Sequence, residues 1–234
     1  MFNAHTKTNP QQKQLGHSKI WGAIVIVQAL TLCASMLTPT HASAQEELRR
    51  FKLLKAEELS AEQAKLAQSI RSGPRSSTGS TATQENAPLG SPFNVWLRSP
   101  EIGDSIQKLG SQIRFNSSLP ARLNEFAILI TAQYWGAQYE WFAHHRLAMK
   151  AGLNPDVAEA VKNQKRPLNM AADEAAVYDF STELHLTHFV SDKTYQQALG
   201  LFGEKGVADL IAVNGYYDLV SMTLNVDRTP VPTH

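Results

Sequence analysis

The feature that most constrains the fold is a series of helix-forming blocks from Pro100 onward, each ended by a glycine, a proline or a capping residue. Asn154-Pro155 combines an N-cap with a first-turn proline, and Ser191 and Gly203 are typical start and stop residues. The sequence shows no alternation of apolar and polar residues typical of strands. We therefore predict an all-α fold, with helices at about 101–115, 120–135, 136–151, 154–165, 171–188, 192–202 and 205–224.

The region before these blocks divides into two parts. Residues 46–70 lack Gly and Pro and are rich in Leu, Ala, Glu and Lys, which predicts one helix, or two broken near Ser60. Gly, Pro, Ser and Thr make up 13 of the 20 residues at 73–92, a composition typical of a flexible connection. We therefore expect an N-terminal helical segment at 45–72, a linker at 73–92 and a helical domain at 93–230.

The first 44 residues resemble an export signal. A polar, basic stretch ends at Lys19, an apolar run extends from Ile20 to about Leu37, and an Ala-x-Ala site ends at Ala44. These are the three parts of a secretory signal peptide, and we predict cleavage after Ala44 and a periplasmic or secreted protein with no membrane association after cleavage. An uncleaved membrane anchor is the alternative, because the apolar run is nearly long enough to span a bilayer.

Charge and cysteine content exclude several functions. The chain has 22 basic and 21 acidic residues, and the formal charge of +1 argues against a nucleic-acid binder. The only cysteine, Cys33, lies in the expected signal peptide, so the exported chain would have neither a disulfide framework nor thiol chemistry. The sequence also contains no glycine-rich phosphate loop, dinucleotide fingerprint or Gly-x-Ser-x-Gly elbow.

Two neighbouring helices carry the candidate catalytic residues. The helix at 120–135 is apolar on opposite faces, which predicts burial in the protein or at a subunit contact, and Glu125 lies among these apolar residues. On the next helix, Glu140 and His144 are four residues apart on the inward stripe, together with Trp141. A carboxylate beside an imidazole in a partly dry site perturbs both pKa values, as a proton relay requires. A helix-stabilising Glu–His pair and a dipole-stabilising Glu125 are the structural alternatives.

A second group of histidines is a weaker signal. His185 and His188 are one helical turn apart, and Tyr178 lies upstream on the same expected helix. A metal site needs three or four ligands, and no partner motif accompanies this pair, so we assign no metal and no cofactor.

Several separated motifs resemble the carboxymuconolactone decarboxylase family, which includes alkyl hydroperoxidase D. The resemblance rests on Leu-Pro-Ala-Arg-Leu-Asn-Glu-Phe-Ala-Ile-Leu at 119–129 and Gly-Ala-Gln-Tyr-Glu-Trp-Phe-Ala-His at 136–144, and it extends over about 90–230. It implies an all-helical fold that self-associates as trimers or hexamers.

The resemblance also implies site residues. The thiol peroxidase branch uses a Cys-x-x-Cys, a His four residues after it and a Glu twelve residues before its first Cys. Glu125 and His144 match the last two, whereas Ala137 and Glu140 stand in place of the cysteines. Without a thiolate and a resolving partner, thiol-based peroxide reduction is disfavoured. The decarboxylase branch, which releases CO2 from a lactone acid without a cofactor, fits better.

The sequence leaves three functions open. The first is a cofactor-independent, lyase-type enzyme acting on a small organic acid or lactone, with Glu125, Glu140 and His144 as its catalytic residues. In this hypothesis Trp141, Tyr134 and His145 contact the substrate, and Arg98, Arg114 or Arg122 could approach its carboxylate. The second is an antioxidant activity of the alkyl hydroperoxidase D type, and the third is a non-catalytic oligomeric binding protein.

Overall fold

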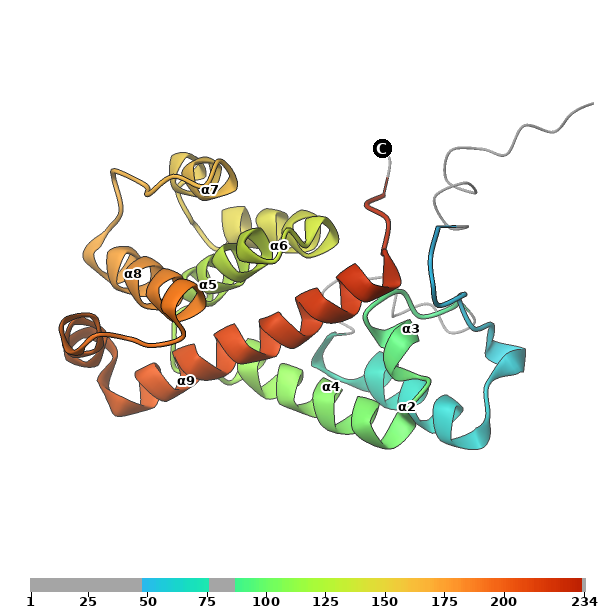
Figure 1. Cartoon of the computed structure of the whole chain (residues 1–234). Coiled ribbons are helices and arrows are strands. Elements are labelled where there is room, and N and C mark those ends of the chain that lie inside the picture. The colour runs from blue at the N-terminus through green and yellow to red at the C-terminus, as the bar shows by residue number, and fades with distance from the viewer. Residues whose placement is uncertain (1–47, 76–86, 233–234) are drawn as a thin grey trace, which may run out of the picture. The chain divides into compact units, whose positions relative to one another are not determined.

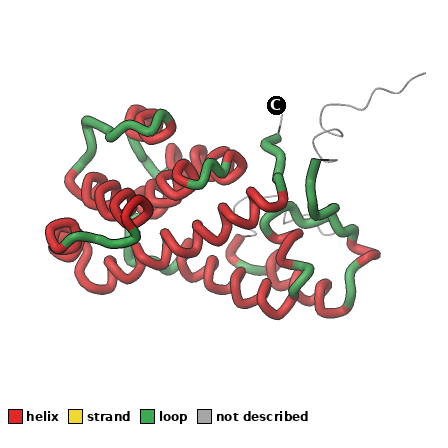
Figure 2. The backbone as a smooth tube through the Cα atoms, viewed as in Figure 1, coloured by secondary structure: helices red, strands yellow, loops and turns green. Residues whose placement is uncertain are grey.

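The structure, a computed structural model, describes residues 48–75 and 87–232, and the expected signal peptide at 1–44 lies outside them. These residues form helices joined by loops, with no strand among them (Figure 2), which confirms the all-α prediction. None of the helices in this part of the chain is long and apolar enough to cross a membrane. In chain order (Figure 1), the elements are η1 (Ala56–Glu58), α2 (Ala61–Ser72), α3 (Phe93–Trp96), α4 (Pro100–Phe115), α5 (Ala121–Tyr134), α6 (Gln138–Lys150), α7 (Pro155–Lys162), α8 (Ala172–Thr187) and α9 (Asp192–Asp227).

The predicted start and stop residues of the helices are in place. The Asn154 side chain accepts a hydrogen bond from the Asp156 N–H at the start of α7. Ser191 caps α9 in the same way, accepting from the Thr194 N–H. Gly203 has φ 66° and ψ 176° and interrupts α9, so this element consists of two helical parts meeting at the predicted boundary.

The N-terminal segment differs from the prediction. Helix α2 begins only at Ala61, after the Ser60 cap, and residues 51–55 are not helical. Their backbone groups bind side chains elsewhere in the domain: the Asn94 amide donates to the carbonyls of Phe51 and Lys52, and its oxygen accepts from the Leu54 N–H. The helix predicted before Ser60 was therefore wrong for residues 51–55, because tertiary hydrogen bonds replace the helical ones there, and only the short 3-10 helix η1 follows.

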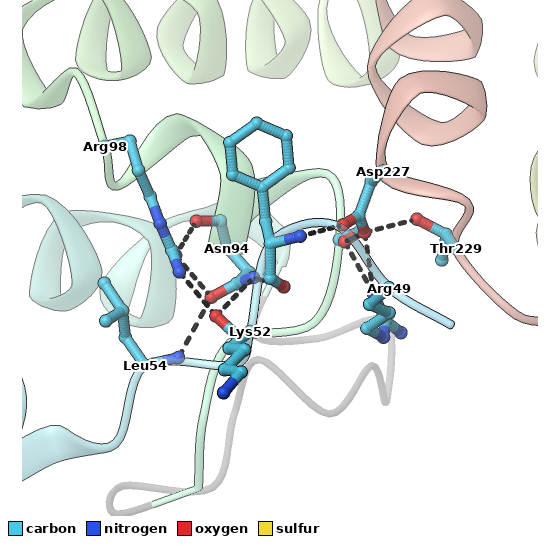
Figure 3. Close-up of polar contacts among 9 residues, drawn as sticks. Arg49, Lys52, Leu54, Asn94, Arg98, Asp227 and Thr229 are labelled. Atoms are coloured by element: carbon cyan, nitrogen blue, oxygen red, sulfur yellow. Dashed lines mark hydrogen bonds and ion pairs between the residues drawn. The ribbon is translucent and has the colours of Figure 1, made fainter. Parts of the chain in front are cut away.

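Asp227, at the end of α9, fastens the same N-terminal segment (Figure 3). Its carboxylate accepts hydrogen bonds from Arg49 Nη1 at 2.8 Å, Ser91 Oγ at 2.5 Å, Thr229 Oγ1 at 2.7 Å and the Phe51 N–H at 3.1 Å. Asp227 is fully buried, so these contacts replace the water that its charge would otherwise require. We call Asp227 and these four partners the Asp227 cluster.

Helix α5 is at the centre of the main core. It packs against α6, α7, α8 and α9, and residues 126–132 are all buried. This confirms the prediction that a helix apolar on opposite faces is buried in the protein. A second, smaller core between α2 and the start of the α3–α4 region consists of Leu66, Ala67, Ile70, Leu89 and Leu97.

The described ends of the expected linker are packed against the domain. Leu89 belongs to the smaller core, Arg75 is buried, and Ser91 is part of the Asp227 cluster. The segment between them, 76–86, lies outside the described residues.

Candidate functional site

The structure brings Glu125, Glu140 and His144 together in the interior. Glu125 comes from α5, and the other two come from one face of α6, four residues apart. His144 Nδ1 lies 2.6 Å from Glu125 Oε2, and Nε2 lies 3.0 Å from Glu140 Oε1. The imidazole therefore bridges two carboxylates, and we call these three residues the Glu–His–Glu triad. The helical stripe predicted for α6 is confirmed, since Ala148 on the same face is buried and Arg146 on the opposite face is exposed.

The two carboxylates determine the charge of His144. Burial lowers the pKa of this imidazole, but Glu140 and Glu125 outweigh burial and raise the pKa to about 9. At neutral pH the ring is therefore a cation between two anions, with both ring nitrogens protonated. Since the side-chain exposures of His144, Glu140 and Glu125 are 7%, 4% and 13%, Glu125 is the member most open to solvent.

One oxygen of Glu140 has no hydrogen bond among the described residues, although it lies only 3.0 Å from His144 Nε2. This atom, Oε1, is buried and makes no hydrogen bond to any described residue, because the contact with His144 Nε2 has ion-pair distance without hydrogen-bond geometry. Glu140 lies in the first turn of α6, whose N-cap, Ala137, contributes no side-chain hydrogen bond. The positive end of the helix dipole supports the Glu140 charge, while one oxygen retains an unused acceptor site.

Two tyrosines form the wall beside His144. The Tyr217 ring meets the imidazole edge to face at 5.1 Å, and Tyr216 meets Tyr217 in the same way at 5.1 Å. Burial raises the pKa of Tyr216 to about 12 and raises that of Tyr217 as well, so both are neutral phenols. Both tyrosines are buried in the main core, and no sequence signal indicated their place beside the triad.

The Tyr216 hydroxyl occupies space that only glycine leaves free. A Cβ added to Gly110 on α4 would lie 2.0 Å from that hydroxyl and 2.6 Å from Arg75 Nη2. Gly110 therefore allows the tyrosine and the buried arginine to approach the α4 backbone. No sequence signal indicated Arg75, because it lies in a segment of linker composition.

The residues predicted to contact substrate are in two different places. Trp141 and His145 stack on each other on α6, with ring centroids 6.0 Å apart. Tyr134 instead stacks on His185 at 4.8 Å, in a second cluster described below.

Two of the three arginines considered for a substrate carboxylate are already engaged. Arg98 donates to Asn94 and to the Lys52 carbonyl, and Arg122 pairs with the carboxylates of α8 at Asp173 and Glu174. Arg114 packs over the Phe115 ring at 5.4 Å.

The predicted histidine pair does not act as a unit. His185 is buried, whereas His188 is exposed and ends α8 in the left-handed conformation, with φ 63°. Within residues 48–75 and 87–232, no group of three or more His, Cys, Asp or Glu side chains is arranged to hold a metal ion.

Sequence comparison provides no family name, but structure comparison identifies the fold. No family model matches the chain, and no curated protein matches its sequence. A protein of unknown function from Agrobacterium tumefaciens, considered a candidate antioxidant defence protein AhpD, aligns with a TM-score of 0.54 at 14% identity, over 60% of this chain and 97% of its own. The debrominase Bmp8 aligns with a TM-score of 0.58 at 12% identity, over 75% of this chain and 90% of its own.

A complex of a cysteine-to-alanine variant of Bmp8 with 2,3,4-tribromopyrrole gives the same TM-score of 0.58, at 13% identity. These similarities define an all-helical, AhpD-like fold for this chain. At such low identity they concern the fold alone, and the activity must be argued from the triad.

Proposed function

We propose that the Glu–His–Glu triad is the acid–base site of a cofactor-independent, lyase-type enzyme acting on a small organic acid or lactone. The observation that carries the proposal is a buried imidazole held between two carboxylates from two helices, with one Glu140 oxygen left without a hydrogen bond. A purely structural ion pair has no need of a second carboxylate or of an unsatisfied acceptor. In the triad His144 holds a proton, and Glu125, which is more exposed, can exchange that proton with a substrate or with solvent.

The proposed reaction follows from this arrangement. When a lactone acid loses CO2, the electrons of the broken C–C bond remain on the substrate as an enolate, which requires a proton at carbon. The His144 cation passes a proton to Glu125, the member most open to solvent, and Glu125 delivers it. Glu140 stabilises the imidazolium before the transfer, and a proton from solvent restores the imidazolium afterwards. The neutral phenol of Tyr217 excludes water from one side of the ring.

The chemistry of the chain favours this proposal over thiol-based peroxide reduction. The chain has a single cysteine, Cys33, so it cannot supply both an attacking and a resolving thiol for such a cycle. Ala137 and Glu140 stand at the positions where the resemblance would place the two sulfurs. A peroxide-consumption assay with an added dithiol as the reductant tests this alternative, and turnover above the protein-free rate would contradict the lyase proposal.

The decisive experiment separates catalysis from folding. Glu125→Gln, Glu140→Gln and His144→Gln are assayed for CO2 release from carboxymuconolactone and other small lactone acids. We expect a loss of at least about a hundredfold in turnover for each, since acid–base groups contribute on this scale. Glu159→Gln, an exposed acid on α7, is the matched control and should retain full activity. Full activity in all three triad variants would exclude the site.

The same variants provide a readout that does not depend on the substrate. Replacing either glutamate by glutamine removes one of the two charges that raise the pKa of His144, so the imidazole pKa measured by NMR should fall from about 9 toward 6.5. An unchanged titration in both variants would show that the triad is not electrostatically coupled.

Export and self-association are part of the proposal. Large apolar side chains remain exposed in the described domain, among them Leu168 at 95%, Phe189 at 78% and Leu186 at 67%. Self-association that covers such side chains would remove apolar surface from water, and we propose trimers or hexamers on this basis. Sedimentation of the purified chain tests the assembly, and N-terminal sequencing of the exported protein tests cleavage after Ala44.

A further inference from the structure

A cavity distinct from the triad lies between α5, α7 and α8. Its volume is about 420 Å³, within the range usual for sites that hold small molecules. Glu125, Glu140 and His144 do not line it. The lining residues are Ile130, Gln133, Tyr134, Val161, Gln164, Tyr178, Thr182, His185 and Leu186.

The lining of this cavity carries no formal charge. It contains no Asp, Glu, Lys or Arg, and His185 is its only group that titrates near neutral pH. Burial lowers the pKa of His185, opposed by Asp218, so the imidazole is neutral. The nearby Arg166 guanidinium, which lies 5.2 Å from the centre of the Tyr178 ring, is already paired with Asp179. An ionic ligand would therefore lose hydration here without gaining a free opposite charge, and an uncharged ligand would avoid that loss.

The cavity is lined by aromatic rings and by side chains that can form hydrogen bonds. The rings of Tyr134 and His185 are stacked, with centroids 4.8 Å apart and planes 13° apart, and Tyr178 stacks on Phe126 at 6.4 Å. The side chains of Gln133, Gln164 and Thr182 add amide and hydroxyl groups to the lining, and none of the three is fully buried. Rings of this kind favour a planar partner, and amide and hydroxyl groups fix its orientation.

A buried polar network holds the His185 wall in place. His185 Nε2 lies 3.1 Å from Thr131 Oγ1, and this hydroxyl lies 3.3 Å from Asn214 Oδ1. The Asn214 amide donates to Ser181 Oγ at 3.1 Å. These side chains are buried at the junction of α5, α8 and α9, where polar groups are costly unless they are satisfied.

The other ring nitrogen of His185 is held as well. Nδ1 lies 3.6 Å from Asp218 Oδ1, and the Trp135 indole N–H donates to the same oxygen at 2.5 Å. The imidazole is thus oriented from both sides before any ligand arrives, which lowers the entropy cost of binding.

From this geometry we propose that the cavity is a binding site for an uncharged, planar small molecule, aromatic or heteroaromatic, that carries an amide-like or hydroxyl group. The ring of the ligand packs against Tyr134, and its polar group bonds Gln133, Gln164 or Thr182. The site is separate from the triad and does not depend on the function proposed for it.

Three probes of nearly identical shape test the charge argument. Benzamide is neutral, benzoate is an anion and benzamidine is a cation, and each is titrated into the full chain while amide signals are followed by NMR. We expect benzamide to shift signals of residues 130–134 and 178–186, with at least about tenfold weaker binding of the two ions. Equal binding of an ion, or shifts that map to the triad helix α6 alone, would overturn the proposal.

Matched variants test the location. Tyr134→Ala should weaken benzamide binding about fivefold, and Thr182→Val should weaken it by a smaller factor, because they remove a stacking face and a hydrogen bond. Tyr195→Ala, which removes a similarly exposed tyrosine from α9, should leave binding unchanged. Equal loss in the control would overturn the assignment. Signals of the cavity that respond to protein concentration but not to benzamide would overturn it in favour of a second copy of the chain.

Discussion

Asp227 and Glu140 are both buried carboxylates, yet they are bonded in opposite ways. Asp227 accepts hydrogen bonds from Arg49, Ser91, Thr229 and the Phe51 N–H. Glu140 faces a single cation, and its Oε1 has no hydrogen bond within the described part of the chain. A saturated carboxylate has no capacity left for a proton or a ligand, whereas an unsatisfied one retains both. We therefore expect the Asp227 cluster to contribute stability, and we propose the triad as the site of chemistry.

The largest loss of stability should come from a substitution that breaks the Asp227 cluster. Asp227→Ala leaves the Arg49 guanidinium buried without its carboxylate, and removing one partner of a buried pair typically costs about 3–5 kcal/mol. We expect the free energy of unfolding, measured by urea denaturation, to fall by this amount. A loss below about 1 kcal/mol would mean that the Asp227 cluster is not a stabilising element.

The triad should make stability depend on pH in a defined window. The pKa of His144 is raised to about 9 in the folded protein from an ordinary 6.5, so folding favours the protonated ring. Its contribution is complete below about pH 6.5 and is lost as the pH rises through about 9, a change on the order of 3 kcal/mol. Unfolding of the wild type and of His144→Asn, measured from pH 6 to 10, should diverge at the acidic end. If the two plots of unfolding free energy against pH ran parallel, the raised pKa of His144 would be contradicted.

A smaller loss of stability is expected where Tyr216 packs against Gly110 on α4. In Gly110→Ala the new methyl group would overlap the Tyr216 hydroxyl, and overpacking of this kind typically costs about 1–3 kcal/mol. Gly200→Ala is the matched control, because it is also helical and has open space around its Cα. The control should be neutral or stabilising by up to about 1 kcal/mol, since alanine favours helices. Equal stability of the two variants would show that the wall is not tightly packed.

The smallest effect is expected from a carboxylate at the surface. Asp104 pairs with Lys108 one turn away on α4, and both side chains are solvent-accessible. Asp104→Ala should lower the free energy of unfolding by about 0–1 kcal/mol, because water screens exposed pairs. A loss as large as that of Asp227→Ala would remove the distinction between the buried and the exposed acid.

Local signals in the sequence were sufficient for the helices but not for the contacts between distant segments. The Asn154 and Ser191 caps, the Gly203 interruption and the inward stripe of α6 all depend on residues close in sequence, and the structure confirms each of them. The helix expected before Ser60 is absent at residues 51–55. Their composition favours helix, but Asn94 and Asp227 bind their backbone from far along the chain.

The triad was predictable in part for the same reason. Glu140 and His144 are separated by one turn, so the helix alone brings them together. Glu125 required the family resemblance, because its contact with His144 depends on how α5 packs against α6. The stacking of Tyr134 on His185 and the cavity between α5, α7 and α8 depend on how these helices pack, for which the sequence contains no local signal.

The Asp227 cluster also has a consequence for how the protein is made. Ribosomes synthesise Arg49 and Phe51 early, but the carboxylate that binds them is added 176 or more residues later. Until translation reaches the end of α9, the first described residues lack this partner and are open to proteases. A nascent or C-terminally truncated chain that lacks Asp227 therefore loses the contacts that hold Arg49 and Phe51. Completion of synthesis, in addition to folding, determines when the start of the domain becomes protected.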